Sequence, residues 1–101
     1  MPRRLNRSSP QMIADRQLIG DNIRAARTAA HVNKPTLTAL SYLAGYPSLY
    51  EQSIGRTERG ERDLTLGEAV TLANVLGCSL DELIVGLPAE AGRPGLELDN
   101  E

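Results

Sequence analysis

The amino-acid sequence predicts an all-α protein, folded as a compact bundle of five short helices. Apolar residues recur at spacings of three and four along several segments, which places them on one face of a helix. Three of these segments follow a Ser/Thr-x-x-Glu pattern, which is typical of a helix N-terminus. No segment alternates between apolar and polar residues as a half-buried strand does. Together these observations favour helices packed on helices.

The first two expected helices occupy residues 9–45. Ser9 is a suitable N-terminal cap, and Pro10 follows at a first-turn position, where its missing N–H leaves no hydrogen bond unmade. The expected inward face of this helix consists of Ile19, Ile23, Ala26 and Ala30. Asn33 is a suitable cap for the second helix, which we expect to end at Gly45.

Each of the other three expected helices follows a capping pattern. The patterns are Ser48-x-x-Glu51, Thr65-x-x-Glu68 and Ser79-x-x-Glu82. The expected terminators are Gly60, Gly77 and Gly86. The expected inward residues are Leu66, Ala69, Ala73 and Leu76 in the fourth helix and Leu80, Leu83 and Ile84 in the fifth. The third helix is expected to run over about residues 49–58.

The 101 residues leave room for one domain. We expect it to span residues 9–87, between a basic, flexible N-terminal arm (1–8) and an acidic C-terminal tail with Pro and Gly (88–101). Three arginines, Arg3, Arg4 and Arg7, make the arm basic. The formal net charge of −2 argues against a large basic surface. Arginine nevertheless recurs every three residues at positions 56, 59 and 62, and local charge matters more than total charge for contact with phosphate.

Several function classes are not expected. The single cysteine, Cys78, cannot form an internal disulfide, and no Cys/His cluster has the spacing of a zinc site. No apolar run approaches the roughly 20 residues that span a bilayer. The basic start is followed by Asn, Ser and Pro rather than by an apolar stretch, so it does not resemble a signal peptide. We therefore expect a cytoplasmic protein, without membrane association, metal or cofactor, that is not an enzyme.

Three stretches, in this order, carry a family resemblance. They are Ile23-Arg24-x-x-Arg27, Gln52-Ser53-Ile54-x-Arg56-x-Glu58-Arg59-Gly60 and Leu72-Ala73-x-x-Leu76-Gly77-Cys78-Ser79-Leu80-Asp81-Glu82-Leu83. Through them, residues 16–86 resemble the phage repressor/Cro (Xre-type) helix-turn-helix family. The resemblance implies a lambda-repressor-like DNA-binding domain, which is a five-helix bundle containing a helix-turn-helix. It also implies a repressor-like transcriptional regulator that binds double-stranded DNA, as a homodimer on an inverted repeat.

The chain departs from the family at the second helix. The family has a Leu-Ala pair about ten residues after the first-helix arginine, followed by a tight turn. Here Leu37 lies ten residues after Arg27, but Thr38 follows it, and the Leu43-Ala44 pair comes six residues later. Either the second helix or the turn over 45–47 is therefore longer than in the family.

The resemblance assigns roles to individual residues. The third helix would lie in the major groove, where Gln suits adenine, Arg suits guanine and Glu accepts from cytosine. The implied base-reading residues are Glu51, Gln52 and Arg56. The implied phosphate contacts are Asn33, Lys34, Ser53, Arg59 and Arg62. Arg27 and Glu58 would form a partly buried ion pair that fixes the angle between the first and third helices.

Two alternative functions remain open. An antitoxin of a toxin–antitoxin pair would use the same DNA-reading helix and also bind a partner protein. A helical protein-interaction module, similar to a co-activator, would keep the bundle without the DNA contacts. The acidic net charge and the altered second-to-third helix connection favour the interaction module, whereas Gln52, Arg56 and the nearby arginines favour DNA.

Overall fold

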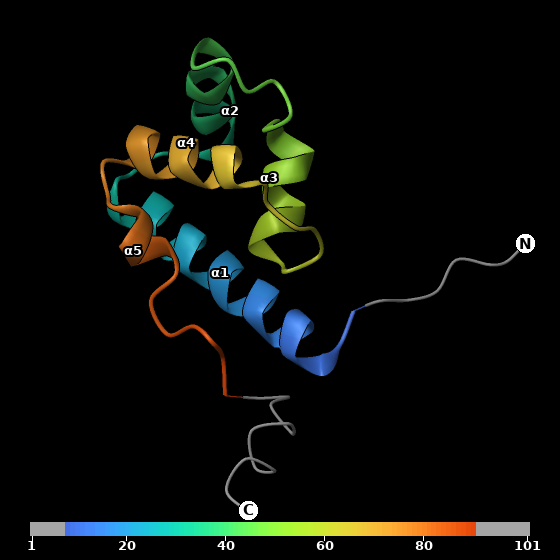
Figure 1. Ribbon diagram of the computed structural model, residues 1–101. Coiled ribbons are helices and arrows are strands. Elements are labelled where there is room, and N and C mark those ends of the chain that lie inside the picture. The colour runs from blue at the N-terminus through green and yellow to red at the C-terminus, as the bar shows by residue number, and fades with distance from the viewer. Residues whose placement is uncertain (1–7, 91–101) are drawn as a thin grey trace, which may run out of the picture.

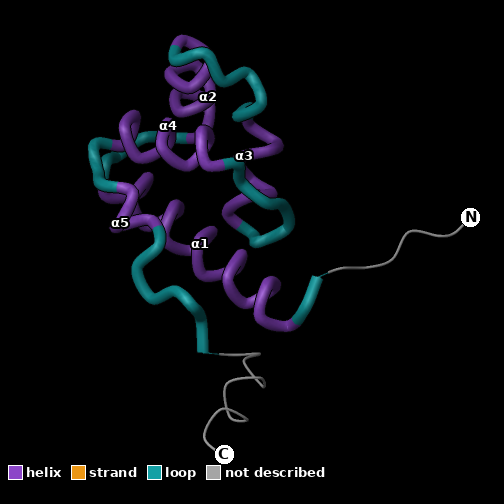
Figure 2. Tube along the Cα trace, in the orientation of Figure 1, coloured by secondary structure: helices purple, strands orange, loops and turns teal. Residues whose placement is uncertain are grey.

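The computed structural model describes residues 8–90, and these residues form five helices and no strand. The helices are α1 (Pro10–Ala29), α2 (Lys34–Leu43), α3 (Glu51–Glu58), α4 (Leu66–Leu76) and α5 (Leu80–Leu83). Figure 1 shows α1 along the base of the bundle. Figure 2 shows that the helices are connected by loops and turns. The all-α expectation is confirmed. The expected arm, with Arg3, Arg4 and Arg7, lies outside the described residues except for Ser8, as does the tail from residue 91.

Most of the expected helix starts are observed. The Ser9 hydroxyl accepts from the Met12 N–H at 3.1 Å, and the side-chain oxygen Oδ1 of Asn33 accepts from the Thr36 N–H at 2.8 Å. Thr65 and Glu68 form a reciprocal capping box, with both hydrogen bonds at 3.0 Å. A second box opens α5. Local side-chain chemistry thus sets these boundaries, because each cap satisfies N–H groups that the first helical turn leaves free.

The expected start of α3 is wrong. Ser48 does not cap this helix, which begins at Glu51 with Tyr50 as its N-cap residue. Instead, the Ser53 hydroxyl accepts from the Tyr50 N–H at 2.9 Å. The Ser48 hydroxyl donates to the carboxylate of Glu68 at 2.7 Å, so a tertiary contact has replaced the local one.

The core draws one or more residues from every helix. The largest fully buried apolar side chains are Ile23, Leu37, Leu49, Ile54, Leu72 and Leu83. Three expected inward residues are exposed. Leu66 is 73% exposed at the first position of α4, Ile84 is 38% exposed just after α5, and Ala30 is exposed beyond the end of α1. Helical spacing predicted the central residues of each face and failed at the helix ends, where the chain no longer packs against a neighbour.

Helices α1 and α3 cross in backbone contact at Gly20. A Cβ atom on this buried glycine would lie 2.5 Å from the carbonyl oxygen of Thr57 and 2.6 Å from that of Glu58. Only glycine permits this approach. The crossing fixes where α3 lies on α1.

The chain folds back onto α1 after α5. The Ala89 N–H donates to the Asp15 carboxylate at 2.8 Å, and the Gln11 amide donates to the Ala89 carbonyl at 2.9 Å. Ala89 is buried. Ala89, expected to belong to the C-terminal tail, therefore packs against α1.

Candidate nucleic-acid interface

Helix α3 has one buried face and one exposed face. Its buried residues are Ser53, Ile54, Gly55, Thr57 and Glu58, and its exposed residues are Glu51, Gln52 and Arg56. Ile54 is 1% exposed and anchors the helix in the core. The three side chains to which the resemblance assigned base reading are therefore the ones that α3 presents to solvent.

An ion pair connects the end of α3 to α1. Arg27 Nε donates to Glu58 Oε2 at 2.6 Å, and a second guanidinium nitrogen donates to Oε1 at 3.0 Å. The side chains are 15% and 5% exposed, respectively. The hydrogen bonds to Glu58 raise the pKa of Arg27, although burial acts in the opposite direction. Because two parallel hydrogen bonds are directional, the pair restrains the orientation of α3 as the resemblance implied.

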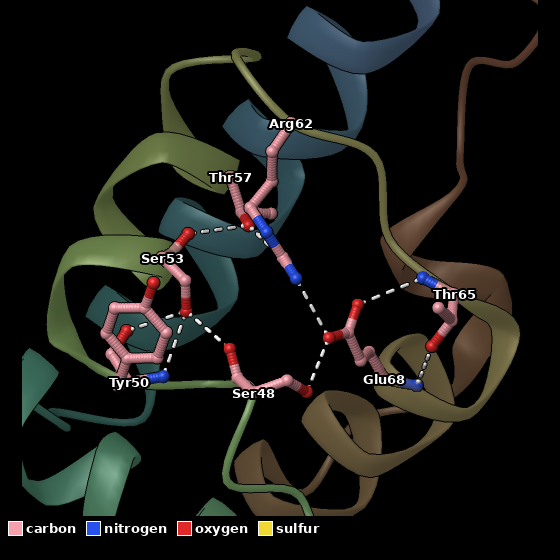
Figure 3. Close-up of polar contacts among 7 residues, drawn as sticks. All are labelled: Ser48, Tyr50, Ser53, Thr57, Arg62, Thr65 and Glu68. Atoms are coloured by element: carbon pink, nitrogen blue, oxygen red, sulfur yellow. Dashed lines mark hydrogen bonds and ion pairs between the residues drawn. The ribbon is translucent and has the colours of Figure 1, made fainter.

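A buried carboxylate connects the start of α3 to α4 (Figure 3). Glu68 accepts from the Ser48 hydroxyl at 2.7 Å, from Arg62 at 2.9 Å and from the Thr65 N–H at 3.0 Å. Burial alone would raise the pKa of the Glu68 carboxyl, but these hydrogen bonds and the Arg62 charge lower it. Glu68 thus holds three separate segments: the connection before α3, the loop after α3 and its own helix start.

Ser53 faces this buried cluster rather than solvent. It is 1% exposed, and its hydroxyl donates to the Ser48 carbonyl at 2.7 Å, with the Tyr50 carbonyl as a second acceptor at 2.9 Å. The assigned phosphate contact would require this hydroxyl at the surface. We therefore leave Ser53 out of the candidate interface and assign it to the N-terminus of α3.

Arg62 is also drawn inward. Its guanidinium donates to the Thr57 hydroxyl at 3.0 Å and to Glu68, and its side chain is 19% exposed (Figure 3). A phosphate contact in the loop would need an arginine whose guanidinium is free at the surface, and the Arg62 guanidinium is instead bonded inside the fold. We assign Arg62 to the support of α3.

Two of the residues assigned to phosphate, Lys34 and Arg59, lie beside α3. Arg59 follows α3 directly, is 58% exposed and pairs with Glu61 at 3.1 Å. The ends of the Lys34 and Arg59 side chains both lie within 4 Å of the point where a Gly55 Cβ would stand. Two cations from different helix ends thus converge over a glycine of α3. Asn33 is exposed beside Lys34, although its side chain already caps α2.

The connection between α2 and α3 covers residues 44–50. Of the two alternatives, a longer second helix or a longer turn, the structure has the longer turn, since α2 ends at Leu43, two residues before the expected Gly45. Leu49 anchors this connection in the core, and the Tyr46 hydroxyl lies against Gly67 of α4. A helix-turn-helix has a turn of three or four residues. Here core contacts, rather than a short turn, set the relation between the two helices.

Sequence analysis missed Glu68 and Gly20 as determinants of this site. Glu68 was recognised only as half of a capping box, and its second carboxylate oxygen carries the tertiary contacts. Gly20 lies inside a helical pattern, where a glycine is unfavourable and so signals a packing requirement.

No family model, curated protein or solved structure matches the chain. Within residues 8–90, no group of His, Cys, Asp and Glu side chains is arranged to hold a metal ion. None of the described helices combines the length and apolar character of a membrane-spanning helix.

Proposed function

We propose that the protein is a repressor-like transcriptional regulator that binds double-stranded DNA sequence-specifically through α3. One observation carries the proposal: α3 is held by its buried face at both ends, while Glu51, Gln52 and Arg56 are exposed together on the other face. A rigidly held helix with Gln and Arg on its outer face suits the major groove, where both side chains can form paired hydrogen bonds with a base edge.

The surroundings of α3 support the same role. Lys34 and Arg59 converge over Gly55 of α3 and would contact phosphates, as would the exposed Asn33, which precedes Lys34 in the chain. Glu51, exposed in the first turn of α3, would accept from cytosine. Because the net charge is −2, phosphate binding would depend on the few basic residues beside α3, and the number of phosphate contacts would be small. Binding to an inverted repeat as a homodimer is part of the proposal and rests on the family resemblance.

Selection from a pool of random duplex DNA tests the proposal. We expect one sequence class to be enriched by the purified protein. Arg56→Ala should then weaken the selected site by about 1–3 kcal/mol and flatten the preference at one base pair. Arg56→Lys is the matched control, because it keeps the charge and loses the paired contact to guanine. It should restore binding strength in part without restoring the preference.

Two results would overturn the proposal. The first is the absence of any enriched sequence at low salt. The second is an unchanged dissociation constant of Arg56→Ala on the selected site.

A protein-binding role is favoured by a different surface. A shallow apolar groove runs between α2 and the connection to α3, with Tyr42 66% exposed, Leu43 79% exposed and Tyr50 44% exposed. Exposed apolar residues that gather in this way are typical of protein-binding surfaces. Both an antitoxin and an interaction module would use such a groove. Co-purification of a partner that Leu43→Glu abolishes, without any effect of Arg56→Ala, would favour the interaction module.

A further inference from the structure

A second cleft lies on the side of the molecule formed by α1, the loop after α3, α4 and α5. Its volume is about 630 Å³, which is within the range of small-molecule sites. The apolar part of its wall is aliphatic throughout and includes Met12, Ile19, Leu66, Ala69, Leu80 and Ile84. Leu66 is 73% exposed there, and Met12 and Ile84 are about two-fifths exposed. An alkyl chain suits this wall better than a planar ring, because the lining offers no aromatic side chain for stacking.

Four ionisable groups line the same cleft: Asp15, Arg16, Arg62 and Asp63. Two of them already form hydrogen bonds or an ion pair with other residues of the domain. Asp15 accepts from the Ala89 N–H and the Gln11 amide, and Arg62 is paired with a buried glutamate. Arg16 and Asp63 are therefore the charged pair available to a ligand.

The guanidinium of Arg16 has unused hydrogen-bonding capacity. One terminal nitrogen donates to Asp63 and the other to the Ser8 hydroxyl, both at 3.2 Å. The Nε atom is buried and has no hydrogen-bond partner among the described residues. Buried donors normally have a partner. The bond to Asp63 is also weakly held, because the Asp63 side chain is 74% exposed and such surface pairs contribute little stability.

We propose that this cleft binds a small fatty-acid-like monocarboxylate. The carboxylate replaces Asp63 on Arg16, and the alkyl chain lies along the aliphatic wall. A monoanion is favoured over a phosphate, because Asp15 and Asp63 repel a second negative charge. Thr57 and Arg62 also line the cleft, so an occupant touches the residues that support α3. Regulation of DNA binding by the occupant rests on the proposed function, whereas the binding itself does not.

Titration of the DNA-free protein with octanoate, followed by two-dimensional NMR of the backbone amides, tests the proposal. We expect saturable shifts confined to residues around the cleft. Octanamide has the same chain without the charge and should bind about tenfold more weakly, since a charge-assisted hydrogen bond is lost. Arg16→Gln should weaken the binding of octanoate by a similar factor and leave the binding of octanamide unchanged. The matched control is Arg24→Gln, an exposed arginine on α1 outside the cleft, which should bind octanoate like the parent.

Three results would overturn the proposal. Octanoate could give no saturable shifts around the cleft, or octanamide could bind as tightly as octanoate. Sedimentation could also show a dimer whose cleft residues are protected and do not respond to octanoate, which would make a second copy of the chain the occupant. The octanamide comparison needs no variant, so it decides the matter even if Arg16→Gln does not fold. Absence of DNA binding would leave the titration unaffected.

Discussion

The ion pair between Arg27 and Glu58 offers the sharpest test of how α3 is held. The perturbation is a double-mutant cycle made of Arg27→Met, Glu58→Gln and the double variant. Each single change leaves one charged group in a site where the side chains are only 15% and 5% exposed. Breaking a fully buried pair costs about 3–5 kcal/mol, so we expect somewhat less here, about 2–4 kcal/mol.

The two single variants should differ in cost. Arg27 also donates to the Val32 carbonyl at 3.1 Å, and Arg27→Met loses this hydrogen bond as well. We therefore expect about 3 kcal/mol for Arg27→Met and about 2 kcal/mol for Glu58→Gln. The double variant removes both charges and should cost about 3 kcal/mol, which corresponds to a coupling of about 2 kcal/mol.

Urea unfolding followed by far-UV circular dichroism measures these free energies of unfolding. The denaturant slopes should agree among the four proteins, so that midpoint shifts report stability alone. Additivity of the two single changes within about 0.5 kcal/mol would refute the reasoning. The contact would then contribute nothing beyond two independent surface charges, and the orientation of α3 would have to depend on other contacts.

Three further perturbations address the same site. Gly20→Ala should cost roughly 3 kcal/mol in urea unfolding, because its Cβ would meet the Thr57 carbonyl at 2.5 Å; a cost near zero would contradict the close crossing. The lowered pKa of Glu68 means that its stabilising contribution is complete above the unfolded carboxyl pKa of about 4.3 and is lost as pH falls through the folded value. Unfolding free energies measured from pH 7 downward should therefore fall less steeply below about pH 5 for Glu68→Gln than for the parent, and parallel curves would exclude this role. Arg59→Ala should weaken binding to all DNA sequences equally and reduce the salt slope of binding by about one. An altered base preference in the selection assay would contradict a phosphate contact.

The local elements of the fold were predictable because their causes lie within a few residues. Asn33 and Thr65 each hydrogen-bond an N–H three residues ahead, so their caps can be read from sequence. Ser48 shows the limit of this reasoning. It has the same Ser-x-x-Glu spacing as Ser79, but a carboxylate from α4 lies within reach and takes its hydroxyl. A pattern cannot show whether a backbone N–H of the same segment or a carboxylate of another helix lies closer to the hydroxyl.

The candidate site divides in the same way. Gln52 and Arg56 are four residues apart and therefore share a helix face, which the sequence alone implies. Ser53 and Arg62 were assigned to the same surface, yet both turn inward. The Ser53 hydroxyl donates to the Ser48 carbonyl, and the Arg62 guanidinium donates to Thr57 and Glu68. Whether a polar side chain faces solvent depends on which buried partner the packing brings to it.

Sequence by itself determined the helical class, most helix starts and the polar outer face of α3, because helical period and capping are local properties. Only the tertiary structure decided the position and orientation of α3 in the bundle. Gly20 meets Thr57 across 37 positions of chain, and Glu68 gathers Ser48 and Arg62 from either side of α3. These contacts depend on the relative placement of helices, which is set by packing of the whole core and is not encoded in any short segment.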